Sequence, residues 1–388
     1  MKKSIKYFFF LVFIYFLFVI LDFFIQRYSY YLLAKRNPEA VLLENKLNEK
    51  KIIERKSAYE SGFRNSIVPL YYEFYPWLEI AEKYNLFPLS SQPFTNIAYC
   101  DEGDGLKKYF TDRFGYRNHD ELWKNEKEIK AIIIGDSFVQ GACVDDNQTI
   151  SSNLMRLSKN NKKVLNLGQG GNGPMHYAAT IKIFLSELET ENLIIVFYSN
   201  DNLNEKNSIT EKIFFSKNNF DYLERNNINN ELQPSLKLKK VYAESIVLAL
   251  NDEKDSYDKG NFIKRSLKYL TFYGIRKTFF QIYENIHEND NLSYSTKVAI
   301  DTALQFCNKK CQVSFAFVPS SKFWAYDPRS EKYQIQIENY LKNFNKKLIN
   351  INETIHDGRS HYSTGIHLNE KGYKALSEKI FKELKNFD

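Results

Sequence analysis

Short apolar runs alternate with segments of helical periodicity through much of this chain, and this alternation restricts its fold more than any other feature. The apolar runs are Ile129–Ile134, Val164–Leu167, Leu193–Tyr198, Val313–Val318 and Lys347–Ile351. Helical patterns lie near Thr149–Leu157, Met175–Leu188, Thr296–Phe306 and Tyr333–Phe344, and a last one runs from Glu370 to about Leu384. Strands that are apolar throughout and alternate with helices form parallel sheets covered on both faces. The sequence therefore predicts an α/β fold, a three-layer α/β/α sandwich around a parallel five-stranded sheet.

Two segments fall outside this alternation. The pattern stops at about residue 202 and resumes at about residue 290, and amphipathic stretches such as Phe262–Tyr283 predict a helical insertion there. Upstream, residues 28–125 begin with a charged stretch, Pro38–Phe63, whose apolar residues recur at roughly helical spacing. We expect a juxtamembrane helix and an irregular lead-in over 28–125, followed by an α/β domain over 126–388.

The N-terminus is strongly apolar. Tyr7–Ile25 follows three lysines, is interrupted only by Asp22, and as a helix would be about 28 Å long, close to the hydrocarbon thickness of a bilayer. A secretory signal peptide would need a small-residue cleavage site, which is missing, and a buried soluble helix would need a core on all sides. The sequence predicts a single-pass transmembrane helix within residues 1–27, acting as a membrane anchor.

The orientation of this anchor follows less directly from charge. Lys2, Lys3 and Lys6 lie on one side of the apolar run, and Arg27, Lys35 and Arg36 nearly balance them on the other. A very short basic tail before a long C-terminal domain favours a cytoplasmic tail and an extracytoplasmic, periplasmic domain.

The four cysteines fit that placement. Cys307 and Cys311 lie four residues apart, which leaves Cys100 and Cys143 as a possible second pair. Two disulfides in an oxidising compartment would use all four, and four reduced, buried thiols are the alternative. No metal site is expected, because the Cys-x-x-x-Cys pair has no matching histidine or cysteine doublet nearby.

The charge pattern does not indicate a nucleic-acid partner. The net charge of +7 arises from 54 basic and 47 acidic residues, spread in small clusters. No recognisable nucleic-acid module accompanies this diffuse excess, which is typical of a solvated surface.

Chemically distinctive groups follow three of the predicted strands. Ser137 follows the first, a glycine-rich turn at 168–173 follows the second, and Asn200 with Asp201 follows the third. In an open parallel sheet, sites form beyond the carboxyl ends of the strands, and His361 and His367 precede the last helix at the same rim. A hydroxyl, an imidazole and N–H donors are the groups that acyl transfer requires.

The glycine-rich turn also has the spacing of a dinucleotide-binding loop, at Gly168, Gly170 and Gly173. That interpretation needs an acidic residue about twenty positions further on, and Asp201 lies somewhat late for it. It would also leave the serine, asparagine and histidine unexplained. We therefore expect an oxyanion loop, with no nucleotide and no cofactor.

Four motifs, taken in order, resemble the signature blocks of the SGNH (GDSL-type) hydrolase and acyltransferase superfamily: IIIGDSFVQGACV, NLGQGG, YSND and GIHLNEKGY. The stretch TDRFGYRN at 111–118 resembles a lead-in of membrane-anchored bacterial members. The resemblance covers about 129–201 and 313–388, and it implies a flavodoxin-like architecture.

The resemblance also implies roles for particular residues. Ser137 matches the nucleophile and His367 the general base. The oxyanion hole would consist of the backbone N–H groups of Ser137 and Gly171 and the side-chain amide of Asn200. Asp136 and Asp201 are expected to be structural, and His361 and His176 to lie outside the chemistry.

One position departs from the family pattern. Thr364 stands three residues before the catalytic histidine, where the family carries an aspartate that orients the imidazole. Asp357 could fold back to replace it, and Gly358 would permit the turn. A Ser–His dyad held by Thr364 or a backbone carbonyl, and a degenerate site, are the alternatives. We assign the role to Asp357.

These features predict a membrane-anchored serine esterase or O-acyltransferase that forms an acyl-enzyme. An extracytoplasmic location would make acyl esters of envelope glycans or lipids a sensible substrate class. The alternative is a non-catalytic protein of this fold that binds glycans or assists envelope assembly. Ser137, Asn200 and His367 favour the enzyme, whereas Thr364 favours the alternative.

Overall fold

The computed structural model describes residues 2–36, 50–51, 53–124, 126–158, 162–203, 219–258, 275, 291–308, 310–324, 327, 329–355, 358–384 and 387. These residues belong to two compact units. One comprises Met1–Lys46 with Asn251–Asp290, and the other comprises Leu47–Leu250 with Asn291–Asp388. All of the predicted site residues belong to the second unit.

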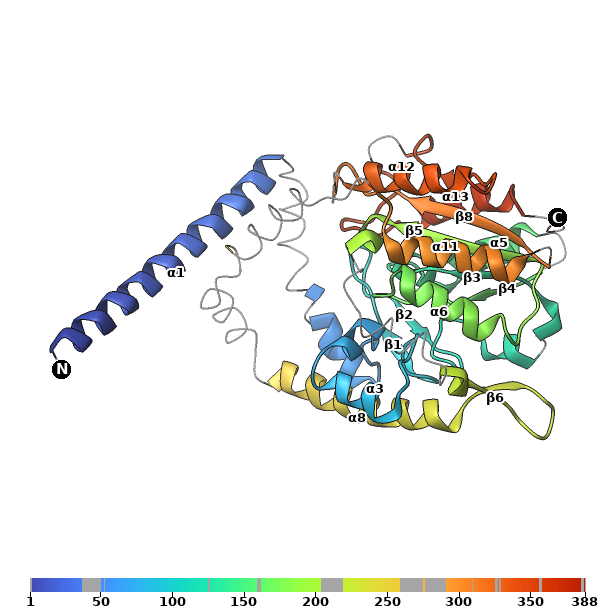
Figure 1. Cartoon of the computed structure of the whole chain (residues 1–388), viewed down its shortest axis with the longest axis horizontal. Helices are drawn as coiled ribbons and strands as arrows, with labels where there is room; N and C mark the ends of the chain where they lie inside the picture. Colours follow the sequence, from blue (N-terminus) through green and yellow to red (C-terminus); the bar gives the residue numbers. More distant parts are fainter. Residues whose placement is uncertain are drawn as a thin grey trace. The chain divides into compact units, whose positions relative to one another are not determined.

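A parallel five-stranded sheet forms the centre of the second unit, as predicted (Figure 1). Its strands are β3 (Ile129–Ile134), β4 (Lys163–Asn166), β5 (Asn192–Tyr198), β8 (Gln312–Val318) and β9 (Leu348–Asn350). They lie in the order β4-β3-β5-β8-β9, and each neighbouring pair is parallel. This is a doubly wound order, in which the first strand of the sheet, β3, lies between the second and the third. The order in which the chain adds strands to the sheet reverses at β3. Folds of this kind bind their ligands in the crevice at such a point.

Helices cover both faces of this sheet. Alternate residues of each strand point to opposite faces, so Ile132 and Ile134 join one core cluster and Ala131 and Ile133 the other. The first cluster includes side chains of α6 (Pro174–Phe184), α11 (Tyr294–Cys307) and α12 (Arg329–Lys342). The second includes side chains of α4 (Ser137–Gln140), α5 (Ile150–Leu157) and α13 (Glu370–Phe381).

The lead-in to the sheet is more regular than the sequence indicated. It contains α3 (Trp77–Tyr84), an antiparallel hairpin of β1 (Asn96–Ala98) and β2 (Lys108–Phe110), and the 3₁₀ turns η1 (Pro69–Glu73), η2 (Asp120–Lys124) and η3 (Glu126–Glu128). Several of its aromatic side chains are buried in the same cluster as α6 and α11: Tyr72, Phe87, Phe114, Tyr116 and Trp123. The lead-in is therefore an integral part of the unit that carries the site.

The inserted segment after β5 is helical only in part. It comprises η5 (Ser199–Leu203), η6 (Asn219–Tyr222), a hairpin of β6 (Leu223–Arg225) and β7 (Leu232–Pro234), and the long helix α8 (Leu236–Asp258). The predicted amphipathic stretch at 262–283 lies outside the described residues, apart from Ile275.

The N-terminal segment forms a single helix, α1 (Lys2–Arg36). Within the described parts of the chain, the structure contains no helix with the length and apolar character that crossing a membrane requires. The predicted transmembrane anchor is thus not confirmed.

Candidate active site

The proposed nucleophile lies at the end of the strand where the sheet order reverses. Asp136 caps α4 by accepting a hydrogen bond from the backbone N–H of Phe138 at 2.9 Å. Gly135 is required before this turn, because a Cβ there would lie 2.5 Å from a methyl carbon of Val139. The turn places Ser137 at the carboxyl end of β3, with 9% of its surface exposed.

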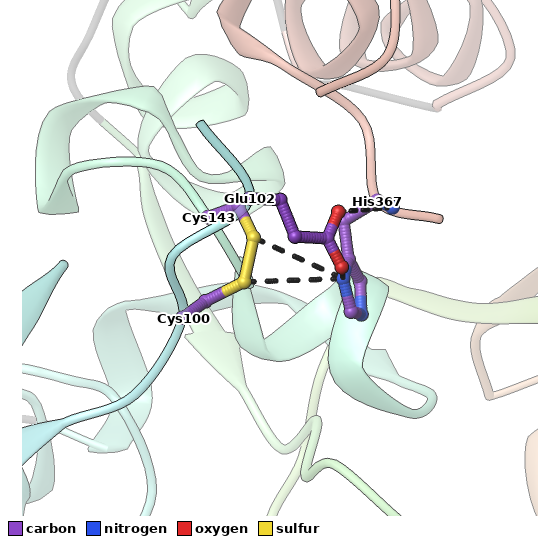
Figure 2. A group of neighbouring side chains, drawn as sticks. All are labelled: Cys100, Glu102, Cys143 and His367. Carbon is purple, nitrogen blue, oxygen red and sulfur yellow. Dashed lines mark hydrogen bonds and ion pairs between the residues drawn. A yellow bond between two sulfur atoms is a disulfide. The ribbon is translucent and has the colours of Figure 1, made fainter. Parts of the chain in front are cut away.

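Ser137, a histidine and a carboxylate are joined by a series of hydrogen-bond contacts. Nε2 of His367 lies 2.9 Å from Oγ of Ser137, and Nδ1 lies 2.8 Å from Oε1 of Glu102. A carboxylate on Nδ1 favours the tautomer that carries its proton there, which leaves Nε2 free to accept the serine proton. Figure 2 shows the carboxylate of Glu102 beside the ring of His367. The three side chains have the connectivity of a catalytic triad.

The carboxylate of Glu102 is held on both of its oxygens. Oε2 accepts a hydrogen bond from the backbone N–H of His367 at 3.0 Å and another from the hydroxyl of Ser363. Burial alone would raise the pKa of Glu102, but the hydrogen bonds and charge of His367, together with the Ser363 hydroxyl, lower this pKa to about 2. Glu102 is therefore a carboxylate at every pH at which an esterase would work.

Thr364 does not contact the imidazole. Its backbone N–H donates to the carbonyl oxygen of Glu102 at 2.8 Å, and its hydroxyl bonds the same oxygen. The next residue, Gly365, leaves room for the carboxylate, because a Cβ there would lie 2.2 Å from Cδ of Glu102. The loop before His367 thus receives a carboxylate from another segment, where the family pattern would supply its own.

Asp357, which we predicted on Nδ1, lies outside the described residues, and Glu102 occupies that position. Sequence reasoning missed Glu102, since it lies 265 positions before the histidine in the loop between β1 and β2. The one local signal was an acidic residue two positions after Cys100 and directly before Gly103.

The predicted oxyanion donors follow β4 and β5, the two strands on either side of β3. Gly171 follows β4 with φ +81°, a conformation that favours glycine, and among the described residues its backbone N–H has no hydrogen-bond partner. Asn200 follows β5, and its buried Oδ1 makes no hydrogen bond within the described structure. The backbone N–H of Gly171 can donate to a ligand, whereas Oδ1 of Asn200 is an acceptor, so only the NH₂ group of Asn200 could donate to an oxyanion.

The aspartates beside these groups have local partners. Asp201 accepts hydrogen bonds from the hydroxyl of Tyr177 and the backbone N–H of Tyr198, each at 2.9 Å. Burial and the nearby charge of Asp136 raise the pKa of Asp201, and burial raises the pKa of Asp136 to about 6. These contacts support a structural role for both, in which they hold the ends of β3 and β5.

The two other histidines considered have different surroundings. His176 is buried in α6, where its ring packs against Phe87 at 5.5 Å between centroids and burial lowers its pKa to about 3. His361 contacts the hydroxyl of Ser360 through Nδ1 at 2.9 Å. The ring that contacts Ser137 is that of His367.

All four cysteines are paired, as Cys100–Cys143 and Cys307–Cys311. Each sulfur of the first pair lies 3.9 Å from Nδ1 of His367 (Figure 2). These two cysteines, Glu102 and His367 place one potential metal ligand each within 4.8 Å of one another. Zinc binds thiolates, however, and both sulfurs here belong to a disulfide. The four residues, as arranged, do not fit a metal ion.

Comparisons with known proteins give limited further information. No protein-family profile matches the chain, and a search of characterised proteins by sequence finds no match. Among solved structures, a lipolytic protein of the G-D-S-L family from Veillonella parvula matches 66% of this chain over 97% of its own, with 13% identity and a TM-score of 0.36. A carbohydrate acetylesterase family member from Sinorhizobium meliloti matches 66% of this chain over 97% of its own, with 8% identity and a TM-score of 0.35. A two-domain esterase active on acetylated mannans matches 69% of this chain over 53% of its own, with 12% identity and a TM-score of 0.32. Likenesses at this level assign neither an activity nor a substrate.

Proposed function

We propose that this chain is a serine enzyme that acts on ester bonds through an acyl-enzyme intermediate. The observation that supports this most strongly is the hydrogen-bonded series from Glu102 through His367 to Ser137, with contacts of 2.8 and 2.9 Å. Each group in the series has the partner that its role requires: a charged carboxylate, an oriented imidazole and a hydroxyl at a strand end.

Attack on the ester begins at Ser137. Its Oγ forms a bond to the acyl carbon while Nε2 of His367 takes the hydroxyl proton, and Glu102 stabilises the resulting imidazolium through Nδ1. The carbonyl oxygen becomes an oxyanion, for which Gly171 and Asn200 are the proposed donors together with the backbone N–H of Ser137.

Collapse of this intermediate releases the alcohol. The bond from the acyl carbon to the alkoxy oxygen breaks, and the imidazolium returns its proton to the departing oxygen, which leaves the acyl group on Ser137. Water or a second hydroxyl then attacks the acyl-enzyme with the same proton transfers. Water gives an esterase, and a sugar or lipid hydroxyl gives an O-acyltransferase.

Membrane attachment and an extracytoplasmic location belong to the proposal. The apolar run Tyr7–Ile25 supports an anchor, and the two disulfides are typical of an oxidising compartment. Acyl esters of envelope glycans or lipids are the substrate class that such a location would offer. Recovery of the full-length protein in detergent extracts of membranes would support this part, and its recovery in the soluble fraction would contradict it.

The non-catalytic alternative depended on position 364, where this chain has a threonine and the family pattern has an aspartate. With Glu102 on Nδ1, no group of the triad is missing among the described residues, and nothing there favours a binding protein over an enzyme.

A fluorophosphonate probe tests the proposal whatever the natural substrate is. The full-length wild-type protein should be labelled and should hydrolyse p-nitrophenyl acetate, and Ser137→Ala should lose both activities while its melting temperature stays the same. Ser360→Ala is the matched control, because this exposed serine contacts His361 and not the triad. Labelling that persists in Ser137→Ala, or is absent from the wild type, would overturn the proposal.

A further inference from the structure

The Cys100–Cys143 disulfide joins two segments that supply different members of the triad. Cys100 lies two residues before Glu102, in the loop between β1 and β2. Cys143 lies six residues after Ser137, and the backbone N–H of Ala142 donates to the carbonyl oxygen of Ser137 at 2.9 Å. The covalent path between the nucleophile and the carboxylate is therefore short, although the cysteines are 43 positions apart in sequence.

The third member of the triad packs against this bond. Both sulfurs lie 3.9 Å from Nδ1 of His367, the atom that donates to Glu102 (Figure 2). The two cysteines are 7% and 4% exposed, so the disulfide is buried beside this hydrogen bond. A bond in this place can influence the positions of both the carboxylate and the imidazole.

The backbone around Cys143 is built to present the sulfur at this point. Cys143 has φ +63°, a left-handed conformation that is unfavourable for a residue with a side chain. Arg117 holds it there, because its guanidinium donates to the carbonyl oxygens of Gly141 at 2.6 Å and Val144 at 2.9 Å, on either side of the cysteine. Arg117 belongs to the TDRFGYRN stretch, so this motif supports the disulfide directly.

The loop of Glu102 has few other restraints outside its contacts with the histidine loop. It contains two glycines with positive φ, Gly103 and Gly105. The backbone N–H of Lys107 donates to the carbonyl oxygen of Cys100 at 2.8 Å and closes the base of the loop. Lys107 also pairs with Asp145 at 3.0 Å. Without the disulfide, Glu102 would depend for its place on these loop contacts, on the bonds of its backbone to Thr364 and on those of its carboxylate.

We propose that Cys100 and Cys143 are positioning residues, whose disulfide fixes Glu102 on Nδ1 of His367 and thereby sets the rate of acyl transfer. This inference rests on the proposed function, since it concerns the same triad. It differs from a general stabilising role because the effect of the disulfide must pass through Glu102.

A double-mutant comparison distinguishes positioning of Glu102 from general stabilisation of the fold. Cys100→Ala with Cys143→Ala should lower kcat for p-nitrophenyl acetate by about tenfold to hundredfold with KM unchanged, the usual scale for a catalytic group displaced by about 1 Å. In a Glu102→Gln background, the same pair of substitutions should change kcat by less than about twofold, because coupled residues are not additive. Equal losses in both backgrounds, or full activity of the cysteine variant, would overturn the inference.

Cys307→Ala with Cys311→Ala is the matched control. This disulfide joins the end of α11 to the residue before β8, at the amino edge of the sheet and away from Ser137. The control should keep its kcat even where its melting temperature falls, and a similar fall in kcat would indicate a general effect of disulfide loss.

A second measurement covers the case in which the cysteine variant does not fold. The wild-type protein can be reduced without denaturant by a phosphine, and mass spectrometry after alkylation identifies which disulfide has opened. Activity should fall in proportion to the opening of Cys100–Cys143, and full activity with this bond open would overturn the inference. Active-site titration with the fluorophosphonate probe distinguishes failure of this inference from failure of the proposed function. A wild-type protein that is not labelled refutes the proposed function, whereas a labelled one leaves the inference to be decided by kcat.

Discussion

Replacement of Glu102 by glutamine is the sharpest test of the site, because it changes one charge and almost no volume. Both oxygens of the carboxylate accept hydrogen bonds from His367, one from Nδ1 at 2.8 Å and one from the backbone N–H at 3.0 Å. A glutamine side chain has only one accepting oxygen. If that oxygen meets Nδ1, the amide NH₂ faces the backbone N–H, and two donors oppose each other.

The reverse orientation of the glutamine is also unfavourable. The NH₂ group would then donate to Nδ1, which moves the imidazole proton to Nε2 and removes the acceptor for the proton of Ser137. Loss of the correct tautomer in a triad costs about four orders of magnitude in kcat, which corresponds to about 5.5 kcal/mol of transition-state stabilisation. We expect a loss of this size in Glu102→Gln.

Steady-state hydrolysis of p-nitrophenyl acetate and the rate of fluorophosphonate labelling would measure it. Ser363→Ala is a matched control, because it removes a neutral hydrogen bond from the same carboxylate and leaves its charge. This variant should lose far less activity. If Glu102→Gln stays within about threefold of the wild type while Ser137→Ala is inactive, Glu102 does not orient the base. Asp357→Asn would then be the next variant to measure.

Four further outcomes follow from the described contacts. Asn200→Ala should lower kcat by about two to three orders of magnitude, as loss of an oxyanion donor does, and an unchanged rate would remove Asn200 from the hole. Gly365→Ala should reduce kcat strongly because its Cβ would lie 2.2 Å from Cδ of Glu102, whereas wild-type kinetics would show that the loop yields easily. Since the pKa of Glu102 is lowered from 4.5 to about 2, the carboxylate contributes about 3 kcal/mol of stability above pH 4.5 that is lost as the pH falls toward 2. Denaturant unfolding at pH 7 and pH 3 should accordingly show the difference between wild type and Glu102→Gln shrinking in acid, and a constant difference would contradict this. Chelation with EDTA should leave esterase activity unchanged, and a loss that zinc restores would reveal a metal role for the cysteine cluster.

The strands could be predicted because each is a continuous apolar run that must be buried on both faces. β5 and β8, the central strands, are almost wholly buried, and their predicted bounds differ from the observed ones by a single residue at the start. The positions of Ser137 and Asn200 after β3 and β5 could be predicted for a related reason, because both follow continuous apolar runs.

Glu102 had no such signal. It lies in a loop between two strands of three residues each, too short for any periodicity to be read. Its place on His367 depends on how the hairpin packs against the histidine loop, which is a property of tertiary contacts and not of local sequence. The packing of the lead-in could not be predicted for the same reason, since Phe114 and Trp123 contact each other in a segment without repeating pattern.

The order in which the triad members occur along the chain has a consequence for biosynthesis. A ribosome makes Glu102 first, Ser137 next, and His367 only 230 residues after the serine. A nascent chain therefore contains the nucleophile and the carboxylate long before it contains the base. If the triad acts as proposed, hydrolytic activity can appear only after His367 has been made and its loop has reached the sheet. A chain truncated before His367 would keep Ser137 and Glu102 but would have no group to take the serine proton, and we expect it to be inert toward esters.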